Sequence, residues 1–393
     1  MLNREIYMQK LMQWKDRKVI KVVTGVRRCG KSTLLQLFSE NLQKQGVSPE
    51  ACISINFENI LFEELKEYHR LHDYITNRLQ PKVMNYIFLD EIQLVPEFEK
   101  AIDSLFLRDN VDIYMTGSNA YLLSSELATL LSGRYVEISM LPFSFKEYYQ
   151  LIGGDKRVAF SNYYSLGGFP YATTLTNPTI YREYIQGIYS TVLLKDIVER
   201  KKIADVALLE AIIRFMFDNI GNLVSVKKIA DTLTSGGRKT TASTVSTYIT
   251  ALKDAFILYE ANRYDVKGKQ YLQSLEKYYL VDISFRTLLL SSRNMDIGHV
   301  LESIVYFELL RRGYKVFIGK IGSSEIDFIA YKGEERIYYQ VSASILDTNT
   351  KEREFAPLRA IKDNFPKYVL SMDDFPMSEN GILQQNIIDF LLE

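Results

Sequence analysis

The sequence predicts an α/β protein whose N-terminal part is built on a parallel β-sheet. Three observations support this: strand-like and helix-like segments alternate over residues 1–150, a glycine-containing turn joins the first strand to the first helix, and polar residues follow the ends of several strands. Such alternation is typical of parallel strands covered by helices, which bind ligands at the carboxyl ends of the strands. The expected strands are 18–24, 51–57, 86–90, 111–116 and 134–140, and the expected helices are 31–44, 61–80 and 97–108.

The turn after the first strand carries the most specific motif of the chain. It has the pattern G-x-x-x-x-G-K-S between a strand and a helix, which predicts a loop that binds phosphate through its backbone N–H groups. Lys31 is expected to reach the β- and γ-phosphates of a nucleotide, and the Ser32 hydroxyl is expected to bind Mg²⁺. The predicted nucleotide-binding residues are Gly25, Val26, Arg27, Arg28, Cys29, Gly30, Lys31, Ser32 and Thr33.

Two carboxylates end the apolar strand 86–90. Asp90 closes this strand and Glu91 follows it, about sixty residues after the phosphate loop. Asp90 is expected to hold Mg²⁺ directly or through water. Glu91 is expected to act as the general base that polarises the attacking water. A strand that ends in a solvated acidic turn is the alternative for the pair taken by itself.

The strand 111–116 is followed by Gly117, Ser118 and Asn119. A polar side chain at this tip can orient the lytic water or contact the γ-phosphate. We assign this catalytic role to Asn119, with Ser118 as the alternative. An ordinary Gly-Ser-Asn turn is the competing interpretation.

Arg134 opens the last strand of this part of the chain. We include Arg134 among the catalytic residues because a guanidinium group can stabilise the charge of a transferred phosphate. Arg134 could act in its own chain or in a neighbouring subunit of a homo-oligomer. A simple surface arginine is the alternative.

Composition limits the class of protein. The 393 residues predict two or three domains, and 47% hydrophobic residues are enough for well-packed cores. Basic and acidic residues balance at 48 each, so DNA or membrane binding would need a local patch. Two cysteines, Cys29 and Cys52, suggest a reducing, cytoplasmic compartment. We expect no membrane association, because apolar runs stay below the ~18 residues of a membrane span.

Residues 151–222 are predicted to be helical, as a lid or linker, and residues 223–285 follow a different pattern. Two short helices separated by Gly236-Gly237 precede a strand–turn–strand segment, which predicts a winged helix-turn-helix. In DNA-binding versions the second helix enters the major groove. Residues 225–270 carry eight basic and four acidic residues, so we expect DNA as a partner, with packing or protein contact as the alternative. The predicted exposed face of the second helix offers Thr241, Ser243, Thr244, Thr247 and Tyr248.

Three polar residues form a further pattern in the last predicted domain, residues 286–393. Glu302 lies on a predicted helix, Asp327 on a strand and Gln340 on the next strand. This layout is typical of a small α/β restriction-endonuclease-like domain, in which such acids bind Mg²⁺.

Two positions depart from that nuclease pattern. Gln340 replaces an acid, and Ser342 stands where a lysine is expected two residues later. We therefore predict that Glu302, Asp327 and Gln340 form a vestigial site without nuclease activity. A lysine supplied by another element, such as Lys351, is the alternative.

Together these segments resemble a bacterial and archaeal family of AAA-like P-loop ATPases with a C-terminal domain of unknown function. The resemblance covers nearly the whole chain and rests on the order of its segments, from the phosphate loop and Asp90-Glu91 through 141–145, 193–197 and 277–282 to 325–328. It implies ATP with Mg²⁺ as cofactors and hydrolysis through Glu91. Residues 1–150 would then be an AAA-like domain with a P-loop NTPase parallel sheet.

The predicted function is Mg²⁺-dependent ATP hydrolysis that couples the nucleotide state to DNA binding. Two alternatives stay open: a signalling switch that binds ATP and a protein partner, and an ATP-gated nuclease.

Overall fold

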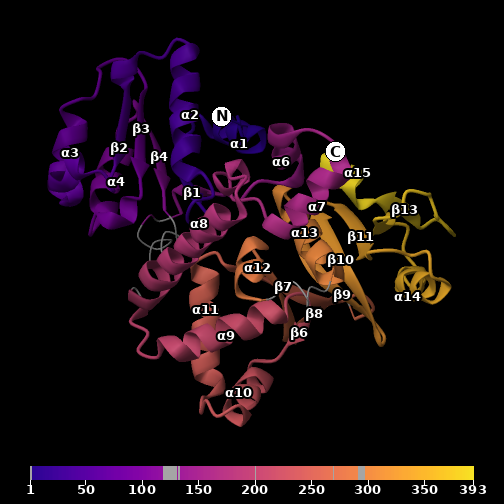
Figure 1. Ribbon diagram of the computed structural model, residues 1–393. Helices are drawn as coiled ribbons and strands as arrows, with labels where there is room; N and C mark the ends of the chain where they lie inside the picture. Colours follow the sequence, from indigo (N-terminus) through magenta and orange to yellow (C-terminus); the bar gives the residue numbers. More distant parts are fainter. Residues whose placement is uncertain (1, 118–130, 132, 200, 269, 291–296) are drawn as a thin grey trace. The chain divides into compact units, whose positions relative to one another are not determined.

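The computed structural model describes residues 2–117, 131, 133–199, 201–268, 270–290 and 297–393. The chain divides into two compact units (Figure 1). The first unit comprises Met1–Pro142 with Asp254–Phe256, and the second comprises Phe143–Lys253 with Ile257–Glu393. The boundaries predicted at residues 151, 223 and 286 all fall within the second unit.

The first unit contains a five-stranded sheet in which all strands are parallel. The strand order is β2-β3-β4-β1-β5, so the carboxyl ends of β3, β4 and β1 lie side by side at one edge. The parallel sheet predicted from the sequence is confirmed, and each strand lies inside or within one residue of its predicted range. The strands are β1 (Ile20–Thr24), β2 (Cys52–Asn56), β3 (Asn85–Asp90), β4 (Val111–Thr116) and β5 (Tyr135–Ser139).

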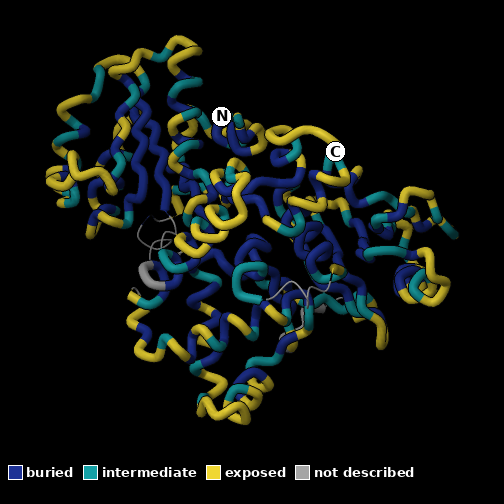
Figure 2. Tube along the Cα trace, in the orientation of Figure 1, coloured by how far each residue is buried: buried dark blue, intermediate teal, exposed yellow. Residues whose placement is uncertain are grey.

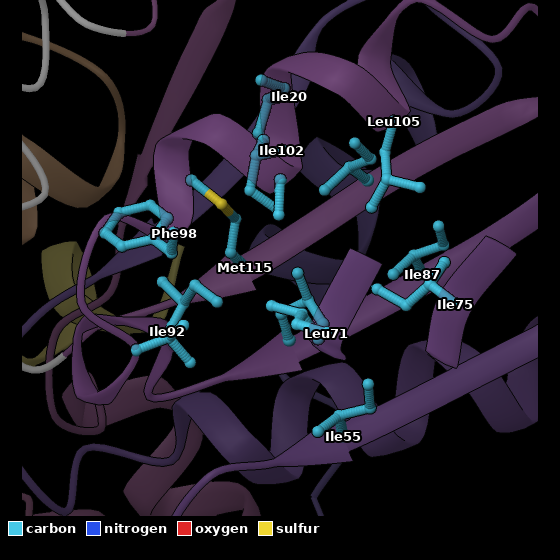
Figure 3. Close-up of a cluster of buried hydrophobic side chains, with 14 of the residues drawn as sticks. Ile20, Ile55, Leu71, Ile75, Ile87, Ile92, Phe98, Ile102, Leu105 and Met115 are labelled. Carbon is cyan, nitrogen blue, oxygen red and sulfur yellow. The ribbon is translucent and has the colours of Figure 1, made fainter. Parts of the chain in front are cut away.

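Helices cover both faces of this sheet. Side chains of β3 alternate: Ile87 and Leu89 pack in the hydrophobic cluster formed with α3 and α4 (Figure 3), as period-two alternation requires. On the other face, Phe88 lies 6.3 Å, ring centre to ring centre, from Phe38 of α2. The three central strands, β3, β4 and β1, are therefore buried along their length, as Figure 2 shows. The helices of this unit are α1 (Glu5–Trp14), α2 (Lys31–Lys44), α3 (Tyr68–Thr76) and α4 (Phe98–Phe106).

The helix predicted over 61–80 is two separate elements, so this prediction is wrong in detail. A 3-10 helix spans Ile60–Lys66 and α3 begins at Tyr68. Between them, the Glu67 carboxylate accepts hydrogen bonds from the backbone N–H groups of His69 and Arg70. This side chain satisfies N–H groups at the start of α3 and so fixes a new helix start there.

The second unit is organised around a mixed eight-stranded sheet of order β13-β12-β11-β10-β9-β7-β8-β6. β7 pairs antiparallel with β8 and parallel with β9. The hairpin that the sequence predicts as a wing therefore belongs to the same sheet as the strands of the predicted nuclease-like domain. The strands are β6 (Leu223–Val224), β7 (Leu258–Asp265), β8 (Gln270–Leu280), β9 (Lys315–Ile321), β10 (Ser324–Lys332), β11 (Glu335–Val341), β12 (Lys367–Ser371) and β13 (Leu383–Asn386).

Helices α13, α14 and α15 contact this second sheet, and no helix among the described residues is long and apolar enough to cross a membrane. One side chain differs from its predicted place: Tyr248 of α11 is buried rather than exposed. The helices are α6 (Phe145–Ile152), α7 (Lys156–Leu166), α8 (Pro178–Thr191), a π-helical segment (Val192–Glu199), α9 (Val206–Asp218), α10 (Val226–Ser235), α11 (Ala242–Asp254), α12 (Ser284–Leu289), α13 (Ile297–Arg311), α14 (Thr348–Arg359) and α15 (Ile387–Leu392).

Candidate functional site

The loop between β1 and α2 has the backbone that its glycines predict. Gly25 and Gly30 both have positive φ angles, 139° and 106°. A Cβ atom at Gly25 would lie 2.0 Å from the Met140 carbonyl oxygen, so no larger residue fits there. Gly30 caps α2 directly, which places the N-terminal N–H groups of that helix beside the loop. Loop and helix end together form a site suited to phosphate.

Lys31 lies in the first turn of α2 and is buried. Its ammonium donates hydrogen bonds to the carbonyl oxygens of Gly25, at 2.9 Å, and Val26, at 3.3 Å. These two hydrogen bonds hold the ammonium against the backbone of the loop, where it could contact a bound phosphate.

The other predicted loop residues differ in exposure. Val26 and Cys29 are fully buried, and burial raises the pKa of the Cys29 thiol, which keeps it protonated. Arg28 is exposed with a φ of 67°. Arg27 forms an ion pair with Glu58 at 3.1 Å. Thr33 is half-buried in the first turn of α2.

A buried arginine outside the motif forms a hydrogen bond with the backbone of the phosphate loop. Arg4, just before α1, donates to the carbonyl oxygens of Cys29, at 3.1 Å, and Leu141, at 2.8 Å. The Tyr7 hydroxyl of α1 accepts from the Leu141 N–H at 3.0 Å. The N-terminal segment therefore joins the phosphate loop to the segment after β5. Nothing in the sequence pattern marks Arg4, because its partners lie 25 and 137 residues away.

Asp90 ends β3 with both carboxylate oxygens in hydrogen bonds. Oδ1 accepts from the Thr116 hydroxyl at 2.5 Å, and Oδ2 accepts from the Asn56 amide at 2.8 Å. Burial raises the pKa of Asp90, while hydrogen bonds from Thr116 and Ser32 act in the opposite direction. Ser32 and Asp90 line the same pocket. Hydroxyl and carboxylate oxygens are the ligands that Mg²⁺ prefers, so the residues present fit this ion.

Glu91 has a backbone that is unusual for a glutamate. It is buried and has a φ of 56°, in the left-handed region. Its N–H donates to the Thr116 hydroxyl at 3.0 Å, and its carboxylate accepts from the Gln93 amide. Strained backbone of this kind is found at functional sites. Thr116 connects Asp90 to Glu91 and so fixes the position of both acids.

Two further residues, Asn119 and Arg134, are predicted to be catalytic. Asn119 lies outside the described residues, as does Ser118. Arg134 precedes β5, and its carbonyl oxygen accepts from the Ile20 N–H at 2.8 Å, at the amino end of β1. The phosphate loop follows the opposite end of β1, about 15 Å away at the ~3.3 Å rise per strand residue. The Arg134 guanidinium pairs with Asp103 at 3.3 Å. This placement is incompatible with a role at the nucleotide site of its own chain.

The second predicted site is also assembled by the fold. Glu302 of α13, Asp327 of β10 and Gln340 of β11 all line one cavity of about 760 Å³ in the second unit. Gln340 is fully engaged: its amide oxygen accepts from the Asp327 N–H and its amide nitrogen donates to Glu354, both at 2.8 Å. Two charged residues that the sequence reasoning missed, Glu354 of α14 and Lys277 of β8, belong to this cluster.

Comparisons with known proteins agree with the two-part organisation. The AAA domain family matches residues 17–149, and the Domain of unknown function (DUF8612) matches residues 157–296. These matches confirm the predicted AAA domain followed by a C-terminal domain of unknown function.

Two relatives match over most of the chain. The "Uncharacterized protein" of Haemophilus influenzae is 40% identical over 402 residues, which cover 100% of this chain and 99% of the relative. "Uncharacterized protein MJ1544" of Methanocaldococcus jannaschii is 31% identical over 367 residues, 88% of this chain and 79% of the relative.

A solved structure shares the fold. The Walker-type ATPase PABY2304 of Pyrococcus abyssi has a TM-score of 0.51 and 19% identity over 74% of this chain and 96% of that chain. At this identity the likeness concerns the fold.

Proposed function

We propose that this chain is a Mg²⁺-dependent ATPase that couples its nucleotide state to DNA binding. The chain belongs to one family with the Haemophilus influenzae and Methanocaldococcus jannaschii proteins described above. The observation that carries the ATPase proposal is the convergence of Lys31, Asp90 and Glu91 at the carboxyl edge of one parallel sheet. Each of these side chains is buried, on an element whose position the sheet determines.

Each group has a distinct task in this proposal. The phosphate loop and the N-terminus of α2 bind the phosphates, and Lys31 exchanges its two carbonyl partners for phosphate oxygens. Ser32 and Asp90 would hold Mg²⁺, which would supply positive charge to stabilise the nucleotide phosphates. Glu91 accepts the proton of the attacking water. Arg134 lies at the amino end of β1, opposite the phosphate loop. If this arginine contributes to hydrolysis, it acts at the nucleotide site of a neighbouring copy of the chain.

Replacing Lys31 with alanine tests the nucleotide site. We expect the Lys31→Ala variant to lose at least about 10²-fold in ATP turnover, because a positioned charge next to the γ-phosphate is removed. The measurement is phosphate release with Mg²⁺ present and with Mg²⁺ chelated. Lys44→Ala, an exposed lysine in the last turn of the same helix, is the matched control and should leave turnover unchanged. Equal turnover in the wild type and Lys31→Ala would contradict the proposal.

DNA binding is proposed for the helix pair α10 and α11. Ser225 and Thr241 accept backbone hydrogen bonds at the starts of the two helices, which are joined by the Gly236-Gly237 turn. A hairpin, β7 with β8, follows the pair, as in a winged helix. The charge of this region is accessible, because its basic side chains Lys227, Lys228, Arg238, Lys239 and Lys267 are exposed.

A charge reversal tests the DNA proposal separately from the ATPase. We expect Arg238→Glu/Lys239→Glu to weaken duplex DNA binding at low salt by at least about 10-fold and to reduce the salt dependence of log Kd by about two units of slope. Fluorescence anisotropy over a salt series measures both quantities, with ATP or ADP present. Lys315→Glu/Lys362→Glu, which changes two exposed lysines elsewhere in the second unit, controls for net charge. Equal losses in both double variants would mean that α10 and α11 do not form the DNA site.

A further inference from the structure

A buried lysine lies inside the acidic cluster of the second unit. Lys277 belongs to β8, and its ammonium is 2.6 Å from Glu325 Oε1 and 3.2 Å from Glu302 Oε2. The Tyr279 hydroxyl donates to the same Glu302 oxygen at 3.1 Å. Lys277 is only 4% exposed, so its charge is balanced by these carboxylates and not by solvent.

The surrounding carboxylates favour the charged form of the Lys277 ammonium. Burial by itself would lower the pKa of Lys277, but Glu302, Asp327 and Glu325 outweigh burial and raise it. Asp327 behaves differently: burial and the neighbouring Glu302 raise its pKa well above the ordinary value, despite the opposing effect of Lys277. The cluster therefore already contains its own positive charge.

With the Lys277 ammonium paired to Glu302 and Glu325, the residues present do not fit the divalent ion that a restriction-endonuclease-like layout implies. Gln340 directs its amide oxygen to the Asp327 N–H and its amide nitrogen to Glu354, so an uncharged side chain held by two partners stands where the nuclease layout has an acid. The Ser342 hydroxyl donates to the Ser344 carbonyl oxygen at 3.0 Å. Within the described part of the chain, no three His, Cys, Asp or Glu side chains are arranged to hold a metal ion.

A lysine supplied by another element, the alternative left open by the sequence, is present in the cluster, but it is Lys277 and not the example Lys351. Lys351 pairs with Glu379 at 3.0 Å. The lysine that enters the cluster comes instead from β8, 25 residues before Glu302 in the chain.

We propose that Lys277 is the built-in cation of this cluster: its ammonium holds Glu302 and Glu325 together in place of a divalent metal ion. The lysine thereby joins β8 to α13 and β10 without any cofactor. The cavity is then a metal-independent polar site, and the second unit does not cleave DNA by a Mg²⁺-dependent route. This proposal rests on the second unit and does not depend on the ATPase.

Manganese binding to the nucleotide-free full chain tests the proposal. Free Mn²⁺ is followed by electron paramagnetic resonance during titration of the wild type, D327N, K277M and K277M/D327N. We expect the wild type and D327N to bind the same number of Mn²⁺ ions. We expect K277M to gain one ion per chain, because uncompensated carboxylates attract a divalent cation, and K277M/D327N to lose this gain. Any weak binding at the phosphate loop is common to all four proteins and cancels.

Two results would overturn the proposal. One is a Mn²⁺ ion bound by the wild type and lost in D327N; the other is a folded K277M that gains no ion. Circular dichroism reports folding, and K277Q replaces K277M if the latter does not fold. If neither variant folds, the comparison of the wild type with D327N decides: equal binding supports the proposal and unequal binding rejects it.

Discussion

Replacing Glu91 with glutamine is expected to stop ATP turnover while ATP binding stays close to the wild-type level. The amide keeps the shape of the side chain but cannot accept a proton from the attacking water. General-base catalysis contributes roughly 10²–10⁴-fold, so we expect a fall in kcat of this size. The measurement combines steady-state phosphate release with the Kd of a fluorescent ATP analogue.

The chain provides a close control for this substitution. Glu97 has the same φ of 56° as Glu91, but it is exposed and pairs with Lys100. Glu97→Gln should therefore retain wild-type kcat, which separates the loss of a base from any effect of glutamine in a left-handed conformation. If Glu91→Gln keeps its kcat within about twofold, a range well below the catalytic contribution, another group is the base.

The second large effect concerns stability at the opposite edge of the same sheet. Lys21 of β1 and Asp112 of β4 form an ion pair whose side chains are at most 1% exposed. The other Asp112 oxygen accepts from the Asp16 N–H, at 2.9 Å, and from the Tyr114 hydroxyl, at 2.8 Å. Asp112→Ala leaves a buried ammonium without its counter-charge. We expect the free energy of unfolding to fall by about 3–5 kcal/mol, measured by urea denaturation.

The double variant Lys21→Met/Asp112→Ala sharpens this test. Burial raises the pKa of Asp112 and lowers that of Lys21, so desolvation outweighs the attraction between the two charges. Removing both charges should therefore restore part of the lost stability. Asp109→Ala, which breaks the exposed Lys18–Asp109 pair, should leave stability unchanged. A double variant less stable than Asp112→Ala would contradict this account.

The phosphate loop and the pair Asp90-Glu91 were predictable because each motif is contiguous. The apolar periodicity of the flanking segments predicts the strands and helices on either side, and this periodicity is a local property of the sequence. The break at Glu67 was missed because a single capping carboxylate ended one helix and began another. The role of Thr116 could not be assigned, since it depends on β4 lying beside β3.

The sequence by itself determined the parallel sheet, the phosphate loop and the identity of the acids at the strand ends. Only the tertiary structure decided which distant side chains complete each site. Arg4, near the N-terminus, donates to the phosphate loop, and Arg134 lies at the amino end of β1, away from that loop. Lys277 of β8 pairs with Glu302 of the acidic cluster. The reason is physical: local pattern determines strands and helices, but strand order determines neighbours. Strand order depends on how the chain buries its apolar surface as a whole.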